Sequence, residues 1–263
     1  MARNCTLLAV LFLCASSFAT IDKGMVLIEK KVSSGGALEG ASFELKYLST
    51  GTSKMLESAP SRSVQFSVDG QKVVFFNRFL DSYGRLQQAL YTMNIDGTER
   101  TRILTADLNK NDSGLRWATD GYIYWASPNV GTYRVLRCPG SGAQDPEIVH
   151  TLTPKVNSPI GTFVEAATGS FQLCRNGKRA TMTAPHKNAS GGKAGWAQYN
   201  FDLETGEDFT AISPCQGGVS PSGELLSASQ AGHRQFRVVK WPNVFVDYGS
   251  DGNTYSGCGV TGG

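Results

Sequence analysis

Two histidines supply the side chains of this sequence that are best suited to hold a metal ion or a carboxylate. His186 and His233 fall in loops at equivalent positions of neighbouring sequence repeats, which could place them on one rim of the fold. Two imidazoles can ligate a transition metal, or pair with a carboxylate when protonated. Because a zinc site needs further ligands and no third one is located, two solvent-exposed loop histidines are the other interpretation. We expect no bound metal and no cofactor.

Other polar and aromatic residues gather in the same class of loops. Binding groups are concentrated on loops that a rigid scaffold holds in place. The sequence contains no Gly-x-Ser-x-Gly nucleophile elbow, no His-Glu-x-x-His motif and no phosphate-binding glycine-rich loop, so we assign no catalytic residue. The binding residues that we expect are His186, His233, Trp196, Arg78, Tyr83 and Arg234.

A repeated strand–turn–strand phrase must position these loops. It is clearest at 65–76, where two apolar strands flank Asp69-Gly70. Its turns recur at Asp120-Gly121, Asn176-Gly177 and Ser222-Gly223, and the four glycines lie 51, 56 and 46 residues apart. A period near 50 residues with several strands per unit is typical of a β-propeller.

A second series of strands alternates with the first, each closed by a turn such as Asp96-Gly97 or Glu204-Thr205-Gly206. Together the two series predict four short antiparallel strands per unit, numbered outward from the axis. The tight turns then share one side of the molecule, the turn face. The opposite side, the loop face, carries four longer connections, which we expect at 77–88, 126–132, 184–195 and 229–234. We therefore place the binding surface on the loop face.

The repeat resembles that of TolB-like propellers, in which Ser-Pro-Asp-Gly-Lys precedes an apolar strand and a later strand ends in Asp-x-Asp-Gly. The matching residues here are Ser67-Val68-Asp69-Gly70-Gln71, Asn94-Ile95-Asp96-Gly97 and Ser220-Pro221-Ser222-Gly223-Glu224. The resemblance covers most of residues 24–250 and implies an all-β propeller of four-stranded blades. It implies almost nothing about activity.

Five units are visible, at 24–57, 63–105, 114–152, 170–213 and 217–249. The first lacks its innermost strand, and we expect 253–260 to supply that strand and close the ring. The segment 157–167 is the candidate for a sixth unit. The predicted domain is a single propeller over 20–260, followed by a tail at 261–263.

The N-terminus reads as a signal peptide. Arg3 supplies a positive charge, 7–13 is a short apolar run, and Ser17-Phe18-Ala19 carries the small residues that a signal peptidase reads. We predict cleavage after Ala19 and a secreted or periplasmic protein, with a retained anchor or lipidation at Cys14 as alternatives. No later stretch is apolar enough to span a membrane. The net charge of +3 does not favour nucleic acid as a partner.

Four cysteines remain after that cleavage, at positions 138, 174, 215 and 258. Export makes disulfides plausible, and four cysteines allow three pairings. We favour Cys174 with Cys215, since both lie near the start of adjacent units. Cys258 would then pair with Cys138 or stay free.

The leading hypothesis is a non-catalytic module or scaffold that binds a protein, peptide or glycan on the loop face. The alternative is a carbohydrate-active lyase or hydrolase with its site at the mouth of the channel on the same face. Asp81, Asp112, His186 and His233 are the residues that such an enzyme could recruit, although their spacing does not demonstrate it. A structural role in a larger envelope assembly is the third possibility.

Overall fold

The computed structural model describes residues 24–33, 39–104, 107–129, 131–142, 144–153, 160–163, 170–188, 195–212, 216–230 and 235–241. These residues form β-strands and turns, and they contain no helix. Accordingly, no helix in this part of the chain has the length and apolar composition needed to cross a membrane. The predicted signal peptide, the closing segment 253–260 and the tail lie outside the described residues.

Sheet 1 contains the first two predicted units, joined by one long strand. Its strands, in spatial order, are β1 (Met25–Ser33), β2 (Glu39–Tyr47), β3 (Ser53–Phe66), β4 (Lys72–Leu80), β5 (Leu86–Asn94) and β6 (Thr101–Arg102). The first part of β3 pairs with β2 and its last part pairs with β4. Ser63 has a φ of 57°, and the pairing register shifts between Arg62 and Gln65. The strand therefore bends as it passes from the outer edge of one unit to the inner edge of the next.

Sheets 2 to 4 correspond to the three later units. Sheet 2 has the order β10-β9-β8-β7, formed by β7 (Ser113–Trp117), β8 (Tyr122–Asn129), β9 (Thr132–Pro139) and β10 (Glu147–Leu152). Sheet 3 contains β11 (Ile160–Phe163), β12 (Ser170–Leu173), β13 (Arg179–Asn188), β14 (Gly195–Asp202) and β15 (Asp208–Ile212). Sheet 4 contains β16 (Gln216–Val219), β17 (Leu225–Gln230) and β18 (Gln235–Lys240).

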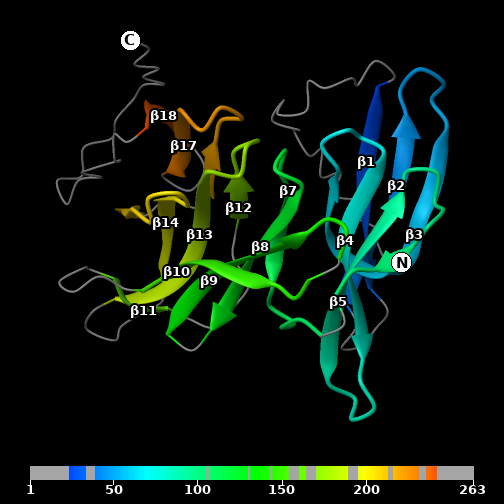
Figure 1. Cartoon of the computed structure of the whole chain (residues 1–263), viewed down its shortest axis with the longest axis horizontal. Helices are drawn as coiled ribbons and strands as arrows, with labels where there is room; N and C mark the ends of the chain where they lie inside the picture. Colours follow the sequence, from blue (N-terminus) through cyan, green and yellow to red (C-terminus); the bar gives the residue numbers. More distant parts are fainter. Residues whose placement is uncertain are drawn as a thin grey trace, which may run out of the picture.

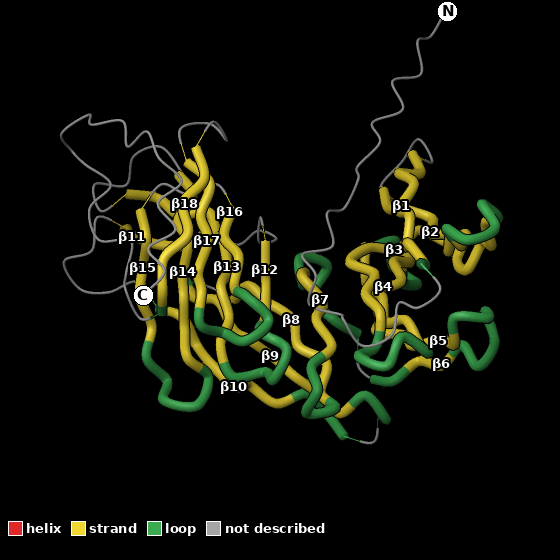
Figure 2. The backbone as a smooth tube through the Cα atoms, turned by 90° about the horizontal axis from the view of Figure 1, so that it is seen from above, coloured by secondary structure: helices red, strands yellow, loops and turns green. Residues whose placement is uncertain are grey.

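The innermost strands of neighbouring sheets contact one another in chain order: β3 contacts β7, β7 contacts β12, and β12 contacts β16. The sheets are consequently arranged side by side along an arc, as Figures 1 and 2 show. The described strands do not close this arc into a ring.

The core consists of apolar layers between facing sheets. The run from Val73 to Phe76 is completely buried, although its successive side chains point to opposite faces of β4. Phe75 packs against Phe43 of the first unit, and Phe76 joins Trp125 in the layer between sheets 1 and 2. A strand buried on both faces reads as a continuous apolar run, which is the pattern of this segment.

The prediction that the tight turns share one face is confirmed by backbone hydrogen bonds between them. Ile95 donates its N–H to the carbonyl of Gln71, and Leu203 donates to Lys178 in sheet 3. Trp241 donates to Glu224 in sheet 4 in the same way. In the second, fourth and fifth units the residue that follows the third strand is thus fixed to the first turn.

The four predicted loops are shorter in the structure than expected, because strands continue into each of them. β13 continues as far as Asn188, and β17 continues as far as Gln230. β4 and β5 stay paired as far as Leu80 and Leu86, so only 81–85 remain as a turn of the predicted loop 77–88. β8 and β9 stay paired as far as Asn129 and Thr132. The strands continue because pairing satisfies their backbone N–H and C=O groups, whatever the polarity of their side chains.

The candidate sixth unit is not a separate sheet where it is described. β11 pairs with the far end of β13, through Ile160 with Asn188 and Phe163 with His186. It therefore extends sheet 3.

Candidate functional site

The first turns of the second and fourth units share a set of side-chain hydrogen bonds. Ser67 donates its hydroxyl to Oδ1 of Asp69 at 2.6 Å and accepts from the Lys72 N–H at 2.9 Å. In sheet 3 Cys174 takes the place of the serine. Its thiol donates to Oδ1 of Asn176 at 2.8 Å and accepts from the Arg179 N–H at 3.0 Å.

The first turn of sheet 2 departs from this pattern because Ala118 has no hydroxyl or thiol to donate. Asp120 keeps one usual contact, since its Oδ1 accepts from the Tyr122 N–H at 2.9 Å. Its Oδ2 accepts instead from the Tyr124 hydroxyl at 2.6 Å. The loss of one side-chain donor has therefore directed the carboxylate toward β8.

Backbone hydrogen bonds fix the first turns of sheets 2, 3 and 4 beside one another. The Thr119 N–H donates to the Arg175 carbonyl at 2.8 Å, and the Arg175 N–H donates to the Pro221 carbonyl at 2.9 Å. These residues occupy the same position of successive repeats. Each of these turns is therefore tied to the next by a backbone hydrogen bond.

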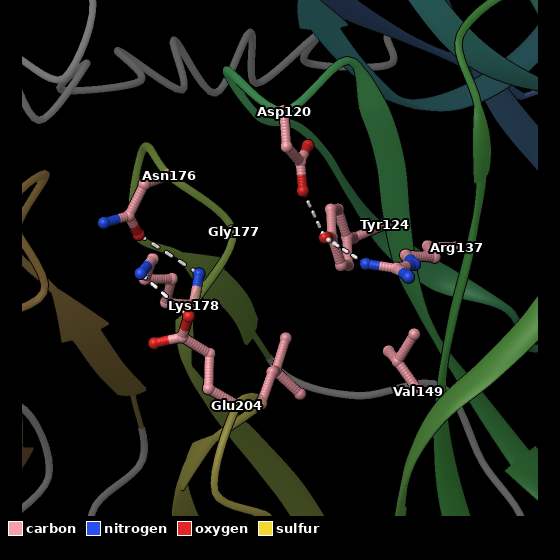
Figure 3. Close-up of a pocket in the computed structure, with 9 residues that line it drawn as sticks. Asp120, Tyr124, Arg137, Val149, Asn176, Gly177, Lys178 and Glu204 are labelled. Atoms are coloured by element: carbon pink, nitrogen blue, oxygen red, sulfur yellow. Dashed lines mark hydrogen bonds and ion pairs between the residues drawn. The ribbon is translucent and has the colours of Figure 1, made fainter.

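A pocket of about 380 Å³ opens on the turn face between sheets 2 and 3. Val149 and Leu203 form its apolar part and pack against the core layer between the two sheets. Figure 3 shows Asp120, Tyr124 and Arg137 on one side and Asn176, Lys178 and Glu204 on the other. The lining residues are Asp120, Tyr124, Arg137, Val149, Asn176, Gly177, Lys178, Leu203 and Glu204.

Both cations that line the pocket are paired with glutamates. Arg137 pairs with Glu147 through its Nε and donates from Nη1 to the Tyr124 hydroxyl at 3.3 Å. Lys178 lies 2.8 Å from Oε1 of Glu204, and this hydrogen bond raises the pKa of the ammonium group. Among the described residues Asp120 has no ion pair, so it is the unneutralised charge of the pocket.

Tyr124 acts as a hydrogen-bond donor in this site. Burial, together with the hydrogen bond to Asp120, raises the pKa of its hydroxyl well above the usual value. The group therefore stays protonated at any physiological pH.

Gly177 lines the pocket at the point where it contacts Asp120 and Tyr124. Its φ is +78°, and a Cβ at this position would lie 2.7 Å from Oδ2 of Asp120 and 2.9 Å from the Tyr124 hydroxyl. The position therefore requires glycine for two reasons, namely its backbone conformation and the close approach of the two sheets.

Comparison with known proteins identifies the architecture. No protein-family model matches the chain, and the search of curated proteins found no match. Among solved structures it is similar to the nidogen/laminin complex, with 12% identity, a TM-score of 0.55, and coverage of 85% of this chain and 73% of that chain. TolB from Acinetobacter baumannii gives 16% identity, a TM-score of 0.55, and coverage of 83% and 52%. The fold is a β-propeller.

The β-propeller domain of the Trilobed protease from Pyrococcus furiosus is a further match, with 12% identity, a TM-score of 0.54, and coverage of 84% and 68%. The sequence repeat that resembles TolB-like propellers is therefore accompanied by a three-dimensional fold similar to that of TolB. This chain spans about half the length of the TolB chain. At these identities the matches show the propeller fold alone.

The structure places two of the expected binding residues at the opposite end of the propeller from the pocket. Arg78 lies near the end of β4, and Tyr83 lies in the β4–β5 turn with 81% of its surface exposed. The Arg85 guanidinium lies 5.0 Å from the centroid of the Tyr83 ring. Asp81 accepts hydrogen bonds from the backbone of Arg85 and Tyr83, which lower its pKa to about 2. Asp81 thus holds the turn in shape and is a poor candidate for proton transfer.

The other expected residues are placed only in part. His186 lies on β13 and Trp196 on β14, at the loop end of the hairpin that these two strands form. In this hairpin His186 pairs with Gly195, and Trp196 pairs with Pro185. The side chains of His186 and Trp196 are outside the described part. His233 and Arg234 lie wholly outside it. The expected site on the loop face therefore remains a prediction.

Within the described residues no group of three or more His, Cys, Asp or Glu side chains could hold a metal ion. Cys138 and Cys174 are free and buried, and Cys215 lies outside the described residues. The predicted pairing of Cys174 with Cys215 is consequently not shown.

Sequence reasoning missed the pocket because its residues come from two units and from turns that the repeat made look purely structural. One signal was available. Ala118 stands where the aligned turns have Ser67, Cys174 and Ser220, so the carboxyl group of Asp120 has no side-chain donor at that position of the turn.

Proposed function

We propose that this protein is an exported β-propeller that binds a protein, peptide or glycan and carries out no chemistry of its own. The observation that carries the proposal is the pocket on the turn face. Its volume lies at the lower end of the range of about 300–1,000 Å³ that is usual for ligand pockets, and it combines an apolar floor with a few fixed polar groups. Ion pairs and hydrogen bonds fix the charged groups of the pocket before a ligand binds, so binding need not order them.

The proposed contact surface therefore differs from the one expected from sequence. The loop-face residues stay a second prediction, of which Tyr83 and Arg78 are the described members. A protein partner has indirect support, because one structural neighbour was solved as a complex of nidogen with laminin. The signal peptide predicted at residues 1–19 supports a secreted or periplasmic location, with cleavage expected after Ala19.

A carbohydrate-active enzyme is the second candidate, favoured by one observation. Burial raises the pKa of Asp112 to about 7, which is the range that suits a general acid or base. However, only 1% of the residue is exposed, and its Oδ2 accepts from the Trp125 indole at 3.2 Å. Its burial leaves it no direct contact with a substrate, so we favour the binding module.

Site-specific photo-crosslinking can test the proposal. The mature chain would carry benzoylphenylalanine in place of Thr205, which is exposed and adjoins Glu204 of the pocket rim, or in place of Tyr83 on the loop face. We expect a specific crosslink from position 205 when the chain is incubated with extracellular or periplasmic extract. A crosslink from position 83 alone would move the binding surface to the loop face. Turnover of a polysaccharide panel, lost in Asp112→Asn, would favour the enzyme.

A further inference from the structure

We propose that the pocket between sheets 2 and 3 receives a lysine or arginine side chain of a peptide segment, with Asp120 as its counter-ion. This inference rests on the proposed binding function and names the chemistry of the ligand.

Charge balance is the first argument. The pairs Arg137–Glu147 and Lys178–Glu204 are each neutral, and Asp120 adds one negative charge without a cationic partner in the described part of the chain. An anionic ligand would have to break one of the two pairs. A cationic ligand would break neither, and it would neutralise the remaining carboxylate.

Hydrogen-bonding capacity is the second argument. Each oxygen of an ionised carboxylate can accept two hydrogen bonds. Oδ1 of Asp120 accepts from the Tyr122 N–H, and Oδ2 accepts from the Tyr124 hydroxyl. Among the described residues these two bonds do not fill the acceptor capacity of the carboxylate, and Asp120 is exposed, so an ammonium or guanidinium group can still bond to it. Tyr124 cannot compensate the charge, because its pKa keeps it neutral.

The equivalent carboxylate of the second unit, Asp69, provides a comparison. Asp69 has the same position in the repeat and also accepts two hydrogen bonds, from the Ser67 hydroxyl and the Gln71 N–H. It differs from Asp120 because it does not line the pocket. Asp69 is therefore a matched control for Asp120.

The apolar floor is the third argument. Val149 and Leu203 line the pocket beside the charged groups, and they can pack against the methylene stem of a basic side chain while its head reaches the carboxylate. A volume of about 380 Å³ suits one or two side chains, which favours a peptide segment or an exposed loop.

The test is a titration of the mature chain with short peptides, followed by NMR shifts of the Gly177 amide. The probes are one peptide with capped ends whose single charge is a central lysine, the same peptide with Nε-acetyl-lysine, spermidine and glucosamine. We expect binding of the lysine peptide that weakens with added salt, and no binding of the acetylated peptide. Equal binding of both peptides would overturn the inference, and tighter binding of spermidine or glucosamine would overturn the peptide as the source of the cation.

Three variants make the result specific to Asp120. Asp120→Asn keeps the acceptor for the Tyr122 N–H, and we expect about tenfold weaker binding of the lysine peptide. Ala118→Ser supplies the hydroxyl of the other turns, and we expect about threefold weaker binding. Asp69→Asn should bind as the parent does. Parent-like binding by Asp120→Asn would overturn the role of this carboxylate.

The crosslinking experiment separates this inference from the proposed function. A partner captured at position 205 together with no binding of basic peptides would leave the binding module standing and reject the cationic ligand. The absence of both would reject both.

Discussion

The thiol of Cys174 donates a hydrogen bond to Oδ1 of Asn176 at 2.8 Å, in the position where the Ser67 hydroxyl donates to Asp69. The Cys174 thiol thus takes the place of the serine hydroxyl as the hydrogen-bond donor of this turn. Burial also raises the pKa of its thiol, which disfavours the reactive thiolate.

Replacing Cys174 therefore tests the turn. Cys174→Ser should keep the hydrogen bond to Asn176 and melt near the parent temperature. Cys174→Ala should lose it, at a cost of about 1 kcal/mol and roughly 2–4 °C in Tm. Calorimetry of the two variants makes the comparison. Peptide mapping under non-reducing conditions should find Cys174 as a free thiol, and a bond to Cys215 would contradict this expectation.

Alanine substitutions at Gly177 and Gly70 distinguish the cost of the backbone conformation from the cost of close packing. Both have positive φ, but a Cβ at Gly70 would meet nothing within 4 Å, whereas one at Gly177 would meet Asp120. Gly70→Ala should cost about 1 kcal/mol of unfolding free energy. Gly177→Ala should cost roughly 1–3 kcal/mol more, because the pocket wall must move. Urea denaturation measures both, and equal losses would contradict the close approach of the two sheets.

Asp112 should make stability depend on pH. Its pKa of about 7 in the folded chain lies above the ordinary value of 3.8, so the folded state retains a proton that the unfolded state has lost. The unfolding free energy should therefore fall as the pH rises from about 4 to about 7, by roughly 4 kcal/mol in total, and be level above that. Asp112→Asn should abolish this part of the slope.

Urea titrations of parent and Asp112→Asn from about pH 5 to about pH 8 measure that slope. Burial lowers the pKa of His150 below 6.5 in the folded chain. The contribution of His150 to the unfolding free energy therefore rises with pH below 6.5. His150 is present in both proteins, so its effect cancels in their difference. Parallel slopes would show that Asp112 does not hold a proton in the folded state.

Tyr83 should contribute little to stability because most of its surface is exposed. Tyr83→Ala should change the unfolding free energy by no more than about 0.5 kcal/mol. If the loop face binds a partner, the same variant should weaken binding while Asp120→Asn leaves it unchanged. Affinity measurements on both variants, once a partner is captured, assign the face.

Local sequence determined the strands and turns of this protein. The glycines at 70, 121, 177 and 223 all have positive φ, as their turns required, and apolar runs such as Val73 to Phe76 became buried strands. These features depend on residues close together in the chain, where backbone sterics and side-chain alternation are sufficient. The placement of the tight turns on one face followed from strand alternation alone.

Tertiary structure decided which residues of different units meet. Thr119 and Arg175 lie 56 positions apart and are joined by a backbone hydrogen bond, and Gly177 reaches Asp120 because sheets 2 and 3 pack face to face. The length of the β4–β5 hairpin was likewise set by strand pairing, which continued through polar residues. The pocket could not be read from the sequence, because its charges and shape arise only when the turns of two units are brought together.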